Sequence, residues 1–72
     1  MNNRPNVIVI FQGADGWHWR RLAPNGRKQY TSGEPFYNKS TAKRAARTHA
    51  RELRVPVRVV MQENGEWTTV PL

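Results

Sequence analysis

The chain has 72 residues, enough for one small domain and too few for a second independent core. It has no cysteine, which excludes disulfide scaffolds, thiol nucleophiles and cysteine-ligated zinc. Twelve Lys and Arg against five Asp and Glu give a net charge of +7, which predicts attraction to polyanions. No apolar stretch approaches the ~18 residues of a membrane span or resembles a signal peptide, so we expect a cytoplasmic protein without membrane contact.

The N-terminal third predicts two strands. Residues 1–6 are polar and are expected to form a flexible tail, which leaves residues 7–72 as a single domain. Val7–Phe11 are five β-formers without a polar alternate, so both faces of this strand should be covered. After a turn, Trp17–Leu22 predict a second strand with both tryptophans on one face, where we expect them in the core under a helix.

The middle of the chain predicts a third strand and the helix. Pro24-Asn25-Gly26 is a tight-turn sequence that should return the chain as an antiparallel strand over residues 27–32. Asn38 can then cap a helix from Lys39 to about Leu53, before Pro56.

Two further strands complete the expected fold. Val57–Gln62 and Glu66–Val70 flank Asn64-Gly65, a strong hairpin sequence. The predicted fold is therefore α+β: a three-stranded antiparallel sheet packed by one helix, followed by a C-terminal β-hairpin (βββαββ). Because a domain this small buries little surface, we also expect a homodimer joined through β-structure, with residues 57–62 and 66–70 as the partners of residues 7–11.

The predicted helix is divided into an alanine face and a basic face. Ala42, Ala46 and Ala50 recur at helical spacing, while five Lys and Arg residues fall in roughly a 100° arc on the opposite side. Like charges three or four residues apart repel each other, and the positive end of the helix dipole adds to this at Lys39 and Lys43. This arrangement favours an anionic partner over a purely solubilising role. Together with four bases on the neighbouring hairpin, the candidate nucleic-acid-binding residues are Lys43, Arg44, Arg47, Arg51, Arg54, Arg20, Arg21, Arg27 and Lys28.

Catalysis and metal binding have little support in the sequence. No paired carboxylates, Ser-His-Asp set or glycine-rich phosphate motif is present, so we expect no enzyme and no cofactor. His49 lies on the apolar side of the helix, where a partly buried structural histidine is the ordinary interpretation. A metal site would need His18 and scattered carboxylates, so no metal is expected.

A set of residues runs in a fixed order and spacing through the first three strands and the helix start: Trp17, Trp19, Arg20, Asn25, Gly26, Ser32, Gly33, Glu34, Phe36, Lys39 and Ala42. This set resembles the YegP-like domains, short prokaryotic modules of unknown function. The resemblance covers about residues 7–61, and the hairpin from Asn64 to Leu72 looks like an extension. It implies a three-stranded sheet with one helix and a closing strand, in single-repeat chains that pair, but no activity, cofactor or substrate. Arg21 and Lys28 replace residues that are usually aliphatic in related modules, which makes part of the sheet surface cationic.

A looser similarity links the chain to the plant-type and integrase-arm DNA-binding domains, in which a three-stranded sheet enters the major groove. It implies that the hairpin bases Arg20, Arg21, Arg27 and Lys28 would contact DNA. Two functions therefore stay open. One is a small basic nucleic-acid-binding protein directed at the phosphate backbone with little sequence specificity. The other is an accessory protein, of cellular or phage origin, that docks on an acidic protein partner.

Overall fold

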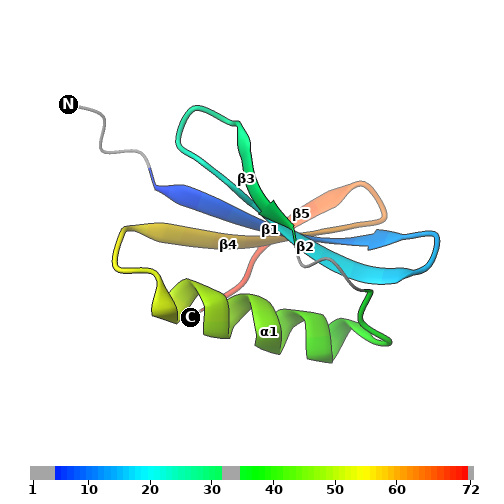
Figure 1. The fold of residues 1–72 in the computed structure, drawn as a ribbon. Coiled ribbons are helices and arrows are strands. Elements are labelled where there is room, and N and C mark those ends of the chain that lie inside the picture. Colours follow the sequence, from blue (N-terminus) through cyan, green and yellow to red (C-terminus); the bar gives the residue numbers. More distant parts are fainter. Residues whose placement is uncertain (1–4, 32–34, 72) are drawn as a thin grey trace.

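Five strands and one helix form the part of the chain, residues 5–31 and 35–71, that the computed structural model describes (Figure 1). The strands are β1 (Asn6–Gly13), β2 (Gly16–Leu22), β3 (Lys28–Thr31), β4 (Val57–Glu63) and β5 (Glu66–Thr69), and α1 (Lys39–Glu52) lies between β3 and β4. All five strands belong to one mixed sheet in the order β3-β2-β1-β4-β5, with only β1 and β4 parallel.

The α+β class with one helix is confirmed, whereas the three-stranded sheet with a separate hairpin is wrong. After α1 crosses one face of the sheet, β4 returns parallel to β1, and β5 extends the same sheet. The pairs Ile8↔Val59 and Ile10↔Met61 place apolar side chains of both strands beneath the helix. Burying these side chains stabilises the parallel pairing of β4 with β1. A β4–β5 hairpin that stood apart from the sheet would leave them exposed.

The pairing also limits how two copies could meet. Both edges of β1 are occupied within the chain, by β2 and β4, so no strand of a second copy can pair with β1. The partners expected for residues 7–11 in a dimer are therefore wrong in part, because β4 fills that position from the same chain. Residues 1–4 of the expected tail lie outside the described residues, and β1 already begins at Asn6, whose N–H donates to the Pro56 carbonyl at 3.0 Å.

The helix begins and ends where the sequence predicts. Asn38 is the N-cap, and its Oδ1 accepts hydrogen bonds from the backbone N–H and the hydroxyl of Thr41, both at 2.9 Å. This satisfies a donor that the first turn of any helix leaves unpaired. The helix ends at Glu52, and the C-cap Leu53 has turned to extended backbone ahead of Pro56.

The core lies between α1 and the face of the sheet that it covers. Ala42 and Ala46 of the helix and Ile8, Ile10 and Val59 of the sheet are almost wholly buried. The small alanines let the helix approach the sheet closely, and the indole rings of β2 supply the bulk. Trp17 and Trp19 are 8% and 6% exposed, which confirms them as core residues.

Two turns depend on left-handed backbone. Asn64 and Gly65 between β4 and β5 have φ angles of 53° and 80°, as the hairpin sequence predicts. Gly16 has φ 137°, and a Cβ there would lie 2.8 Å from the carbonyl oxygen of Phe36. That contact follows from a bridge in which Trp17 and Phe36 exchange backbone hydrogen bonds, which fixes the chain ahead of α1.

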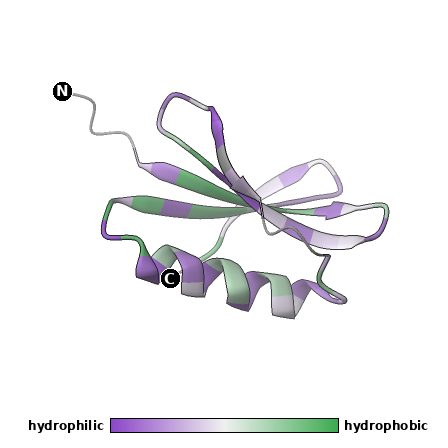
Figure 2. Cartoon of the chain, in the orientation of Figure 1, coloured by the Kyte–Doolittle hydropathy of each residue, from purple (hydrophilic) through white to green (hydrophobic). Residues whose placement is uncertain are grey.

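The second face of the sheet has no helix over it, and we call it the open face (Figure 1). The sequence predicted that both faces of residues 7–11 would be covered, and within this chain α1 covers only one. Val9 on the open face is nevertheless only 6% exposed, because side chains of the neighbouring strands surround it. Figure 2 shows hydrophobic stretches along β1 and β4 and hydrophilic ones around the outside of α1.

Candidate nucleic-acid interface

The basic side chains of α1 follow the arc that helical periodicity predicts. Ala42, Ala46 and Ala50 are buried, whereas Arg44 and Arg51 are exposed and Lys43 and Arg47 are half-buried beside the alanine face. His49 on the other flank contacts β2 and β3, so the basic flank is turned toward the β4 side of the sheet. The helix therefore presents its cations away from the open face.

The two adjacent arginines of β2 lie on opposite faces of the sheet. Arg20 is on the open face, and its guanidinium lies 4.2 Å from the centroid of the Phe11 ring. Arg21 shares the helix-covered face with the tryptophans, and its Nε is buried without a hydrogen-bond partner among the described residues. Strand alternation separates the two, so a single surface cannot use both.

Four of the predicted residues and one that was missed lie at the same end of the molecule. Lys28, Leu22, Val7 and Arg58 form one cross-strand row, which places Lys28 and Arg58 three strand spacings, or about 14 Å, apart. The end of α1 lies at the same end because β4 begins five residues after it (Figure 1). We call this group of five the basic end, and its members are Arg27, Lys28, Arg51, Arg54 and Arg58, all exposed.

Arg58 was absent from the predicted set although the sequence contains the pattern that places it. It lies between Val57 and Val59 in the strand, so its side chain must point to the face opposite the one on which these valines pack. The sequence does not show which residues lie next to Arg58, because only the parallel pairing of β4 with β1 brings Arg58 into the cross-strand row of Lys28. Of the other five predicted residues, Lys43, Arg44 and Arg47 lie nearer the start of α1, and Arg20 and Arg21 lie on opposite faces of β2.

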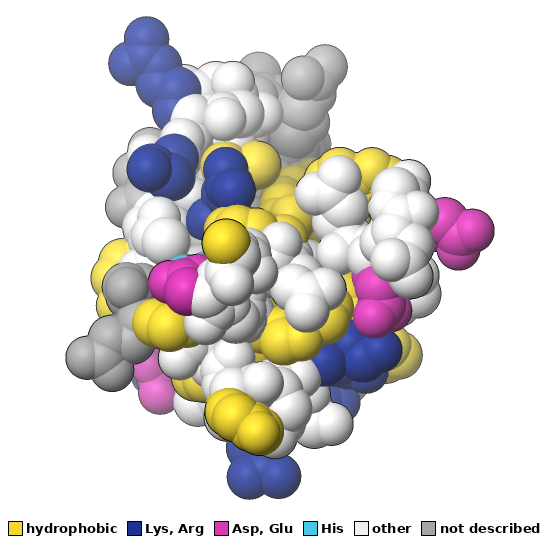
Figure 3. All heavy atoms as spheres, turned by 90° about the vertical axis from the view of Figure 1, so that its right-hand side faces the viewer, with side chains coloured by type: hydrophobic (Ala, Val, Ile, Leu, Met, Phe, Trp, Pro, Cys, Tyr) yellow, Lys and Arg dark blue, Asp and Glu magenta, His cyan; other side chains and the backbone are white. Residues whose placement is uncertain are grey.

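The opposite end of the molecule carries most of the described carboxylates. Asp15 lies in the β1–β2 turn, and Glu63 and Glu66 flank the β4–β5 turn. Figure 3 faces this end, where acidic and hydrophobic side chains reach the surface together with several Lys and Arg side chains. At the basic end Glu52 is the one carboxylate among the described residues. The described carboxylates are thus distributed unevenly between the two ends of the molecule.

Lys39 is the one lysine or arginine with an ion pair among the described residues. Its Nζ lies 3.2 Å from both carboxylate oxygens of Glu63, and 5.9 Å from the Trp17 ring centroid. The pair offsets the unfavourable position of Lys39 at the positive end of the helix dipole, although a half-exposed pair contributes only about 0–1 kcal/mol. The members of the basic end have no such partner among the residues described.

His49 belongs to an aromatic cluster between α1 and the sheet. Its ring lies 4.7 Å from Trp19 and 5.3 Å from Tyr30, measured between centroids, and Tyr30 in turn stacks on Trp19 at 5.4 Å. Burial lowers the pKa of His49 below its usual 6.5, and the nearby Arg21 charge lowers the pKa further, against a weaker raising effect of Glu52. A neutral, packed ring agrees with the structural role predicted for this residue.

The second histidine sits at the edge of the open face. His18 Nε2 and Asp15 Oδ1 are 2.7 Å apart, and this hydrogen bond is the main cause of a lowered pKa for the exposed Asp15 carboxyl. The imidazole also stacks on Phe11, with centroids 5.6 Å apart and ring planes 20° apart. The two histidines therefore belong to different faces, and within residues 5–31 and 35–71 no three metal-binding side chains come together.

No protein-family model, curated protein or solved structure gives a significant match to the chain. The resemblance to the YegP-like domains therefore stays a prediction. In the described part of the chain, α1 is too short and too polar to cross a membrane.

Proposed function

We propose that this protein is a small, non-catalytic nucleic-acid-binding protein that contacts the phosphate backbone with little sequence specificity. The observation that supports it best is the basic end, where five exposed Lys and Arg side chains gather at one end of the fold and have no ion pair among the described residues. Leaving five like charges together is unfavourable for the isolated chain, and phosphates would neutralise them.

The arrangement fits backbone contacts better than base reading in a duplex. The five side chains come from the β2–β3 turn, the end of α1 and the start of β4, so they spread over the end of the molecule. The β2–β3 hairpin protrudes at this end (Figure 1), but it carries only two of the five side chains, Arg27 and Lys28. Such a dispersed set positions a protein on phosphates without reading sequence. The integrase-arm similarity, which would place Arg20 and Arg21 on one reading surface, gains no support from their opposite directions.

The test compares two charge reversals of equal size. Arg51→Glu with Arg54→Glu removes two members of the basic end, while Lys43→Glu with Arg44→Glu makes the same charge change farther along α1. Binding to several unrelated 20-base-pair duplexes is measured over a salt series. If the basic end contacts five phosphates, log K should fall with log salt with a slope of about −4.5.

The Arg51/Arg54 variant should lose about two units of that slope, and the Lys43/Arg44 variant should lose less. Equal losses would place the contact along the whole helix, as the sequence alone suggested. No binding to any oligonucleotide at low salt would refute the proposal. The charge would then be better explained by an acidic protein partner, which a pull-down that survives nuclease treatment would identify.

A further inference from the structure

The open face combines an apolar centre with planar groups and positive charge. Val7, Val9 and Phe11 of β1 run along its middle, flanked by Leu22 of β2 and Val60 of β4. Arg20 and Arg58 are the charged side chains that these strands place on it, and the described residues of β1, β2 and β4 add no carboxylate to this face. A partner should therefore have apolar or aromatic surfaces together with negative charge.

Three planar side chains form a stack on two neighbouring strands. Phe11 of β1 contacts the Arg20 guanidinium at 4.2 Å and the His18 imidazole at 5.6 Å, both from β2. The hydrogen bond to Asp15 holds the imidazole in place. These contacts fix the rings in a preorganised array, which reduces the entropy lost when a ligand is ordered on it.

A fourth planar group lies on the same cross-strand row. Phe11 pairs with Gln62 of β4, and Gln62 pairs with Trp67 of β5. Two strand spacings place Trp67 about 9.5 Å from Phe11. Unlike the two core tryptophans, Trp67 is 59% exposed, so its ring offers a free stacking surface.

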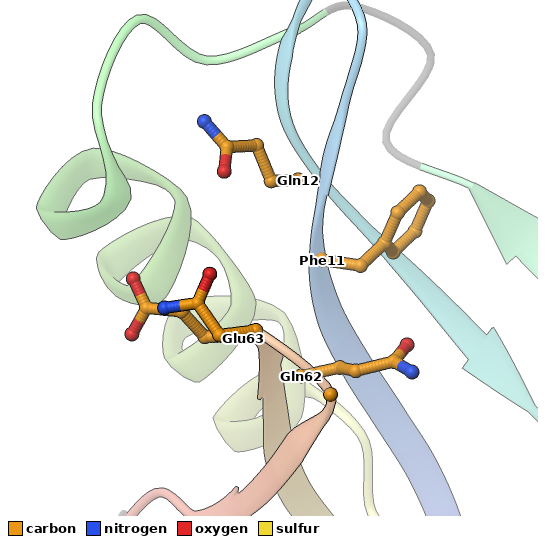
Figure 4. Close-up of a pocket in the computed structure, with 6 residues that line it drawn as sticks. Phe11, Gln12, Gln62 and Glu63 are labelled. Atoms are coloured by element: carbon orange, nitrogen blue, oxygen red, sulfur yellow. The ribbon is translucent and has the colours of Figure 1, made fainter.

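A pocket of about 320 Å³ lies at the ends of β1 and β4, next to Phe11, and its other lining residues are Gln12, Gln62, Glu63, Asn64 and Gly65. Figure 4 shows Phe11 and Gln62 pointing to one side of the sheet, and Gln12 and Glu63 pointing to the other, toward α1. The Gln62 and Asn64 amides at the pocket can both donate and accept hydrogen bonds, as the edge of a nucleobase requires. The pocket therefore pairs a ring wall with polar groups suited to a base.

We propose that the open face binds single-stranded nucleic acid by stacking unpaired bases on Trp67 and against the stack that Phe11 forms with His18 and Arg20, with Arg20 and Arg58 near the phosphates. This inference rests on the proposed function and names its substrate. The bases of a duplex are already stacked and paired, so only an unpaired strand can place them flat on side chains. A second copy of this chain fits less well, because face-to-face packing would bring Arg20 and Arg58 of both copies together, and the one described carboxylate beside this face, Asp15, lies at its edge and is bonded to His18.

The probe is a 15-nucleotide oligodeoxythymidylate, with a duplex of the same length as comparison. Trp67→Ala should weaken single-strand binding by about 5- to 150-fold, since one stacked base contributes that much, and leave duplex binding within about twofold. Phe11→Leu, which keeps the apolar volume, should weaken the single strand in the same direction. Thr68→Ala is the matched control, because this exposed neighbour of Trp67 points to the other face.

A second readout follows Trp67 directly. Because Trp17 and Trp19 are buried, acrylamide quenching of the parent protein reports mainly on Trp67, and the oligonucleotide should reduce it. Unchanged quenching together with unchanged single-strand affinity in Trp67→Ala would overturn this inference. The proposed function would still stand if the Arg51/Arg54 reversal weakened binding. If the parent binds no oligonucleotide, both fail. If Trp67 is protected from acrylamide without ligand in a dimeric protein, the face belongs to a second copy.

Discussion

The alanine face of α1 gives a quantitative prediction about how closely the helix must lie on the sheet. Ala46 is fully buried and belongs to the same core cluster as Trp17 and Trp19. Ala46→Leu adds three carbon atoms at this position. Burying them in an existing space would stabilise the fold by about 2 kcal/mol, at about 0.8 kcal/mol per carbon. No such space is expected at a closely packed contact, so the helix must move or the side chains must leave their rotamers.

Overpacking of this kind costs about 1–3 kcal/mol, and helix propensity changes little between alanine and leucine. For a domain of 60–100 residues, each kcal/mol lowers Tm by about 4–8 °C, so a cost of about 2 kcal/mol should lower it by about 8–16 °C. Thermal unfolding followed by far-ultraviolet circular dichroism measures the shift. Urea unfolding should give a lower midpoint with an unchanged slope.

Ala45→Leu is the matched control because Ala45 is half-buried at the border of the core. Its larger side chain can extend along the surface, so we expect a change within about 0.5 kcal/mol. An Ala46→Leu protein as stable as the parent would refute the reasoning, because it would show that the helix does not need small residues against the tryptophans.

Three further predictions concern stability and assembly. His49 has a lowered pKa in the folded protein, so the unfolded chain binds a proton first, and stability should fall as the pH drops below about 6.5. Tm measured from pH 7.5 to 5 should show this fall, and His49→Leu should remove it; an equally steep fall in the variant would contradict the assignment. Asn38→Ala removes the helix cap and should cost about 1 kcal/mol of stability, or about 4–8 °C in Tm. Asn38→Asp retains the cap and should cost less. An unchanged Tm in Asn38→Ala would argue against the cap. The homodimer stays a prediction, and the outer strands β3 and β5 are the sheet edges through which two copies could pair. Sedimentation at micromolar concentration should give twice the 8.4 kDa chain mass, and a value equal to the chain mass would contradict the dimer.

The sequence alone determined the features that depend on nearby residues. The helix bounds follow from the Asn38 cap and the 3.6-residue period of the alanines, and the β4–β5 turn follows from Asn64-Gly65. Strand alternation likewise predicted that the two tryptophans of β2 share the core face. Each of these depends on interactions within a few residues, so the local sequence is sufficient to specify them.

Only the tertiary structure decided which strands pair and which charged side chains become neighbours. The parallel pairing of β1 with β4 joins residues about fifty positions apart, and a strand's alternation does not specify the partner of its backbone hydrogen bonds. That pairing builds the open face, sets Trp67 on the row of Phe11, and brings Arg58 to the end where Lys28 and Arg51 lie. The nine predicted cations were read from local sequence, and long-range packing divided them between the basic end, the helix flank and the two faces of the sheet.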